Sequence, residues 1–98
     1  MQTERRQYER FVVPGTVLLN HENQIIHCQL ENISSYGAYL SVGEKLHSHY
    51  IEVGDYVTCN ISIPDRETQA LSGNIIRIAL NGINNYLAVY LLQPYSFF

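Results

Sequence analysis

The chain has 98 residues, of which 46% are hydrophobic and 15% charged, and its formal net charge is −3. These values fit one compact globular domain and exclude a disordered chain. The acidic balance also argues against a general nucleic-acid-binding protein, which usually presents a broad basic face. The sequence has no signal-peptide pattern, and its longest apolar run, FVVPGTVLL, is too short to span a bilayer, so we expect a cytoplasmic protein.

Alternation of apolar and polar residues predicts six short β-strands. In chain order their approximate ranges are 12–20, 24–31, 37–42, 55–63, 69–80 and 85–92. The fourth shows the pattern most clearly, because Val57, Cys59 and Ile61 alternate with Thr58 and Asn60. Turn-forming residues separate the runs, and no stretch has helical periodicity. Since a small antiparallel sheet hides its edges best by closing, we expect an all-β, six-stranded antiparallel barrel.

Arginine is concentrated at the N-terminus. Arg5, Arg6 and Arg10 are three of the six Lys and Arg residues in the chain. We expect residues 1–11 to form an arm and residues 12–98 to form the barrel. On its own an RxxxR pattern is common, and a solvated tail balanced by Glu4 and Glu9 would explain it.

A second motif lies between the second and third predicted strands, in the stretch ENISSYGAYLSV. It places Asn32, Ser34 and Gly37 as NxSxxG. Asn and Ser bond to nearby backbone groups and Gly permits a positive φ, so a tight turn alone would explain these residues. The same turn would also suit a ligand, because the missing Cβ at Gly37 lets a planar ring approach the chain. The motif alone leaves both interpretations open.

Together, and in this order, the two motifs resemble the PilZ domain family over essentially the whole chain. RRxxxR corresponds to residues 5–10 and (D/N)xSxxG to residues 32–37, and residues 53–55 and 72–78 are weaker similarities. The resemblance implies a receptor for the bacterial second messenger cyclic di-GMP. In that family the arm wraps over the barrel, its arginines grip phosphates and guanines, and the turn holds the ligand from the other side.

Matched residue by residue, the motifs assign ligand contact to Arg5, Arg6, Arg10, Asn32, Ser34 and Gly37. The resemblance associates a cation at Arg5 with an intercalated pair of nucleotides, so we expect two copies per domain. Guanidinium groups suit both phosphate oxygens and the guanine edge. Because ordering a flexible arm costs about 1–2 kcal/mol of backbone entropy per residue, we expect the arm to be loose when empty and clamped when occupied. We expect this ordering to signal through a protein partner.

The sequence departs from the family pattern at its end. Pro94 argues against a helix continuing from the last strand, so we expect a C-terminal helix that is short or absent. The terminal aromatic residues would then pack against the barrel or form a patch for a partner. Two alternative functions remain: a nucleotide-independent adaptor, and a small barrel that binds single-stranded nucleic acid through its arginines and exposed tyrosines.

We expect neither an enzyme nor a metal or cofactor site. No His stands in a convincing relation to a nucleophile and a carboxylate. Cys28 and Cys59 lie singly inside predicted strands, which favours buried free thiols. His47 and His49 share a long connection with no third ligand nearby, which is typical of exposed loop residues.

Overall fold

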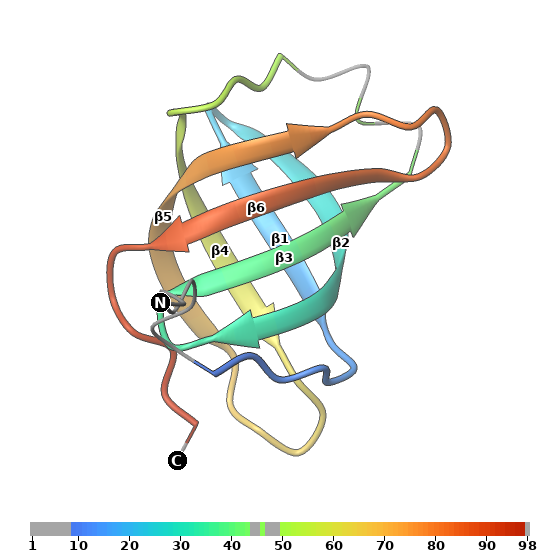
Figure 1. The fold of residues 1–98 in the computed structure, drawn as a ribbon. Coiled ribbons are helices and arrows are strands. Elements are labelled where there is room, and N and C mark those ends of the chain that lie inside the picture. Colours follow the sequence, from blue (N-terminus) through green and yellow to red (C-terminus); the bar gives the residue numbers. More distant parts are fainter. Residues whose placement is uncertain (1–8, 44–45, 47–49, 98) are drawn as a thin grey trace, which may run out of the picture.

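The computed structural model describes residues 9–43, 46 and 50–97 (Figure 1). It contains six strands, which are β1 (Thr16–His21), β2 (Gln24–Ser34), β3 (Gly37–Val42), β4 (Tyr56–Ser62), β5 (Gln69–Ala79) and β6 (Asn85–Leu91). All neighbouring pairs are antiparallel, and the strands close into a barrel in the order β1–β2–β3–β6–β5–β4. The predicted all-β, six-stranded barrel is therefore confirmed.

Two strand boundaries differ from the sequence prediction by more than one residue. β1 begins at Thr16 rather than at residue 12, because residues 12–15 form an irregular segment that contains Pro14, which has no N–H to donate. This segment runs along the lower rim of the barrel in Figure 1, and Phe11 before it forms an isolated bridge to Ile33. β2 continues to Ser34 rather than ending at residue 31, because a bulge inside it allows the pairing to resume.

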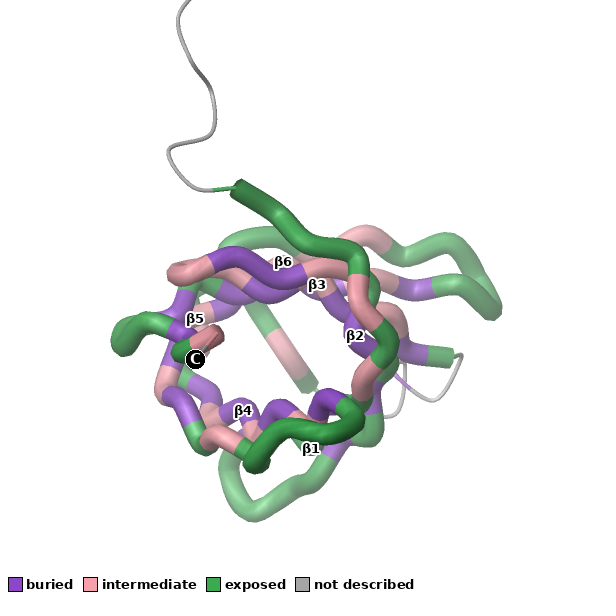
Figure 2. Tube along the Cα trace, turned by 90° about the horizontal axis from the view of Figure 1, so that it is seen from below, coloured by how far each residue is buried: buried purple, intermediate pink, exposed green. Residues whose placement is uncertain are grey.

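The core fills the inside of the barrel, as the alternation predicted. Figure 2 shows buried residues recurring along every strand around the barrel wall. Leu19, Leu40, Ile61, Leu87 and Leu91, from four of the strands, are all completely buried. Each such side chain contributes roughly 1.5–3 kcal/mol when it is removed from water, so these positions dominate the stability of the barrel.

The two cysteines belong to this core, as predicted. Cys28 on β2 and Cys59 on β4 are free thiols, exposed by only 4% and 0%. Burial disfavours the thiolate and raises the pKa of each thiol from 9.0 to about 12, and at Cys28 a smaller contribution comes from the neighbouring Cys59.

This burial predicts slow alkylation of the folded protein. At pH 8 a thiol with a pKa of about 12 has an about 1,000-fold smaller thiolate fraction than one with a pKa of 9.0. Iodoacetamide should therefore modify both cysteines at least about 100-fold more slowly in the native protein than in the urea-unfolded chain. Mass spectrometry over time measures both rates, and a native rate equal to the unfolded one would contradict the burial.

A buried histidine stabilises the end of the barrel opposite residues 9–12 and 92–97 (Figure 1). His21, at the end of β1, is 5% exposed, and its Nε2 lies 2.9 Å from Oδ2 of Asp55. The same carboxylate oxygen accepts a hydrogen bond from the backbone N–H of Glu52, also at 2.9 Å. Gly54, with φ of 98°, allows the tight turn just before Asp55. These contacts fix the loop that leads into β4.

The segment after β6 contains no helix in its described part, residues 92–97. It turns back under the barrel, so that the described residues near both termini lie at the same end (Figure 1). Across the described residues, no helix is long and apolar enough to cross a membrane.

Candidate ligand-binding site

Four residues from four strands form a row on the outside of the barrel. Asn32 on β2 pairs with Tyr39 on β3, Tyr39 pairs with Ala88 on β6, and Ala88 pairs with Arg77 on β5. Directly paired residues present their side chains on the same face of a sheet, so the row is continuous. It combines an amide, a phenol and a guanidinium group around the small side chain of Ala88.

Two β-bulges put the polar ends of this row on the outer face. In β2 the register shifts between Leu30 and Asn32, and in β5 it shifts between Ile75 and Arg77. Leu30 and Ile75 face the core, and strict alternation would send Asn32 and Arg77 inward too. Each bulge inserts one extra residue, which turns the following side chain to the opposite face. A buried unpaired guanidinium would be very costly, so the bulge at Arg77 also protects the fold.

The row is the floor of a surface pocket of about 420 Å³. Its lining residues are Arg10, Asn32, Gly37, Ala38, Tyr39, Ile76, Arg77, Ala88 and Val89. Two of these residues are cationic and none is acidic. Among the described residues only Arg10, Arg66 and Arg77 are Lys or Arg, so two of the three lie at one pocket in an acidic protein. The pocket is therefore suited to an anion.

At Gly37 the limit on a larger residue is space rather than backbone conformation. The positive-φ glycines of the described chain are Gly54 and Gly82, so the interpretation in which Gly37 supplies a positive φ to the turn does not hold. A Cβ at Gly37 would instead lie 3.1 Å from Oγ of Ser34, which is tight, and it would stand in the wall of the pocket. The expectation that a missing Cβ leaves room for a close approach fits this geometry.

The sequence-predicted residues are partly brought together. Arg10, Asn32 and Gly37 line the one pocket. Ser34 is 8% exposed and lies beside Gly37, but it does not line the pocket. Arg5 and Arg6, like His47 and His49, lie outside the described residues.

Tyrosine side chains frame the pocket. Tyr39 stacks on Tyr86 with ring centroids 5.4 Å apart and an interplanar angle of 1°. Tyr36 and Tyr90 form a second stacked pair at 6.3 Å and 18°. Tyr86 and Tyr90 lie two residues to either side of Ala88 on β6, so the two stacked pairs are next to this pocket-lining residue. A flat ring system would find both space and stacking surface there.

Arg77 and Tyr39 were missed by the sequence reasoning, although one signal was available for Arg77. Strict alternation in GNIIRIAL would bury Arg77 between apolar neighbours, and a charged side chain in that position requires either a partner or a bulge. No comparable signal exists for Tyr39, because its place in the pocket depends on the pairing of β3 with β6.

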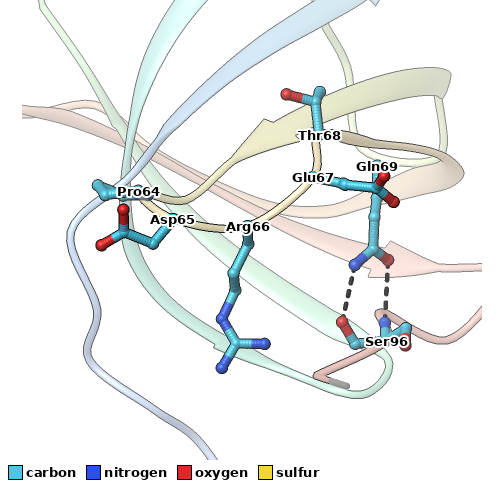
Figure 3. A pocket seen from close by; sticks show the side chains of 7 residues that line it. All are labelled: Pro64, Asp65, Arg66, Glu67, Thr68, Gln69 and Ser96. Atoms are coloured by element: carbon cyan, nitrogen blue, oxygen red, sulfur yellow. Dashed lines mark hydrogen bonds between the residues drawn. The ribbon is translucent and has the colours of Figure 1, made fainter.

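A larger pocket of about 670 Å³ lies elsewhere, between the β4–β5 turn and Ser96 (Figure 3). Asp65 and Glu67 line it together with Arg66, so its mixed charge does not select an anion. None of the sequence-predicted site residues lines this pocket. Within the described part of the chain, no group of three or more His, Cys, Asp or Glu residues is arranged to hold a metal ion.

Comparison with known proteins places the chain in a family. The family model of the PilZ domain matches residues 4–93, which include both sequence motifs. The structure of the inhibitor of motility (MotI/DgrA) of Bacillus subtilis is similar, with a TM-score of 0.77 and 18% sequence identity. The similarity covers 96% of this chain but 46% of that chain, so this chain spans less than half of that protein and shares its fold. No curated protein sequence matches significantly. Because the family model covers most of its length, the chain belongs to the PilZ domain family.

Proposed function

We propose that the protein is a cyclic di-GMP receptor and that the pocket at Arg10 and Arg77 is its binding site. PilZ domains are generally receptors of this kind. The observation that carries the proposal is the charge of the pocket: two of the three described cations line it, and no described lining residue is acidic. A compact dianion needs such a local cationic site, whereas a polynucleotide would favour a basic face.

The pocket residues suit the parts of a cyclic dinucleotide. Arg10 comes from the arm and Arg77 from β5, so their guanidinium groups can reach phosphate oxygens or the O6/N7 edge of guanine from two sides. The Asn32 amide can donate and accept hydrogen bonds at a base edge. Tyr39 offers a ring face for stacking, and Gly37 leaves room for the base.

The remaining assignments rest on the family motif. Arg6 is assigned the same role as Arg10, and Ser34 supports the turn beneath Gly37. Arg5 favours a pair of stacked nucleotides. Binding would order the arm over the pocket, and the ordered arm would be recognised by a protein partner.

Isothermal titration with cyclic di-GMP tests the proposal. We expect saturable heat with about two nucleotides per chain, and much weaker binding of cyclic GMP, which carries one phosphate charge and one base. A fitted stoichiometry near one would remove the intercalated pair but keep the receptor. A folded protein that gives no saturable heat would contradict the receptor and favour the adaptor alternative. Salt-sensitive binding of oligonucleotides without selectivity for the dinucleotide would favour the nucleic-acid alternative.

A further inference from the structure

The last residue of β6 and the segment that follows this strand are both bonded to the turn that carries the NxSxxG motif. Leu91 N–H donates to the carbonyl oxygen of Tyr36 at 2.9 Å, and Tyr95 N–H donates to that of Ser35 at 2.7 Å. Ser35 and Tyr36 are the two residues between Ser34 and Gly37. The candidate ligand turn is therefore held at Tyr36 by the end of β6 and at Ser35 by the C-terminal segment, which we define as residues 94–97.

The C-terminal segment also packs against Phe11, the residue at which the arm joins the barrel. The ring of Phe97 lies 5.0 Å from that of Phe11 at an angle of 59°, and 5.0 Å from that of Tyr95 at 71°. Phe11 is in turn fixed to β2 by two backbone hydrogen bonds with Ile33, of 2.8 and 2.9 Å. Since Phe11 directly follows Arg10, the aromatic contact and the two backbone hydrogen bonds together hold the residue from which Arg10 leaves the barrel.

A third set of contacts comes from the β4–β5 connection. The side-chain amide of Gln69 donates to the carbonyl oxygen of Ser96 at 2.7 Å and accepts from its N–H at 2.9 Å, as Figure 3 shows. Arg66 donates from Nη1 to the carbonyl oxygen of Phe97. These hydrogen bonds lie at exposed positions, where water competes for the same groups, so each contributes little to the stability of the docked segment.

Docking of the segment carries an internal penalty. Tyr95 is 2% exposed, and its hydroxyl group has no hydrogen-bond partner in the described structure. A buried polar group without a partner costs free energy, which offsets part of the gain from burying the ring. Because this cost opposes the gain from burial, small changes in the arm or the turn can change how often the segment is docked.

We propose that the C-terminal segment is a positioning element of the cyclic di-GMP site. In its docked position it holds the Ser34–Gly37 turn and, through the Phe11–Phe97 contact, the exit of Arg10 in the geometry that receives the ligand. This inference rests on the proposed function. Linkage requires the reverse effect as well: bound ligand must stabilise the docked segment by the same factor by which docking strengthens ligand binding.

Phe97→Ala tests the proposal, because Phe97 is only half-buried and its loss leaves the barrel core intact. We expect an about fivefold higher Kd for cyclic di-GMP in isothermal titration, the scale of effect that one aromatic pair can transmit. Leu92→Ala is the matched control, since Leu92 also follows β6 but is 47% exposed, and its Kd should stay within about twofold of the native value. The double variant Phe11→Ala/Phe97→Ala should bind cyclic di-GMP no more weakly than the weaker-binding single variant, because both substitutions remove the same contact.

Amide hydrogen exchange provides a readout that loss of stability alone would not move. In the native protein, saturating cyclic di-GMP should slow exchange of the Tyr95 and Ser96 amides by at least the factor by which Phe97→Ala raises Kd, because the substitution removes only part of the docking contacts. The positioning role would be overturned if the native protein binds cyclic di-GMP, Phe97→Ala has the same Kd, and the ligand does not change exchange of the Tyr95 and Ser96 amides. The proposed receptor function would then remain. Absence of binding by the native protein would overturn both.

Discussion

Arg10→Ala is expected to weaken cyclic di-GMP binding by roughly 30-fold or more, equivalent to ~2 kcal/mol. Hydrogen bonds to charged groups contribute about 1.5–3 kcal/mol each, and the substitution removes one of two described cations at the pocket. Arg10 is exposed, so its truncation should leave the folded barrel unchanged. Isothermal titration gives the affinity, and thermal unfolding checks the fold.

Arg10→Lys separates charge from geometry. Lysine keeps the positive charge but loses the planar fork that bonds two phosphate oxygens or a guanine edge at once. We expect an affinity between those of the native protein and Arg10→Ala. The same alanine substitution at Arg6, which lies outside the described residues, is expected to act like Arg10→Ala. Unchanged affinity in both alanine variants would show that the arginine assignment is wrong.

The six strands could be predicted from the sequence because side chains in a closed barrel alternate between two environments. Every side chain faces either the core or the solvent, so a period of two persists through residues such as Val57, Cys59 and Ile61. The alternation fails at the two bulges, since an inserted residue changes the face without changing the composition. The length of β2 was underestimated for that reason: Leu30 and Ile33 both face the core although they are three positions apart.

The candidate site was predictable only where a local motif carries it. Arg10, Asn32 and Gly37 were identified from two short patterns, and the structure places all three at one pocket. Arg77 and Tyr39 belong to strands that meet because β3 pairs with β6 and β6 pairs with β5. That register is set by the closure of the whole barrel, and no spacing within a single strand encodes it.

Asn85 illustrates the same limit in the core. Its sequence context, after Asn81-Gly82 and Asn84, places it where a turn meets the sixth predicted strand and gives no sign that its side chain is buried. In the structure Asn85 begins β6 and is completely buried. Its Oδ1 accepts from the Asn81 N–H at 2.9 Å, and its Nδ2 donates to the carbonyl oxygens of Gly43 at 3.1 Å and Gly82 at 2.9 Å. One amide side chain thus joins the β5–β6 turn to the residue that follows β3.

Asn85→Ala is expected to lower the free energy of unfolding by about 3 kcal/mol, since three hydrogen bonds of about 1 kcal/mol each are lost at a buried position. The penalty stays near this value because Gly43 and Gly82 are exposed and water can reach their freed carbonyl groups. Asn84→Ala is the matched control: Asn84 is the exposed neighbour, and its truncation should change stability by less than about 0.5 kcal/mol. Urea unfolding followed by tyrosine fluorescence measures both variants, and equal unfolding free energies would show that the Asn85 amide does not hold the turn.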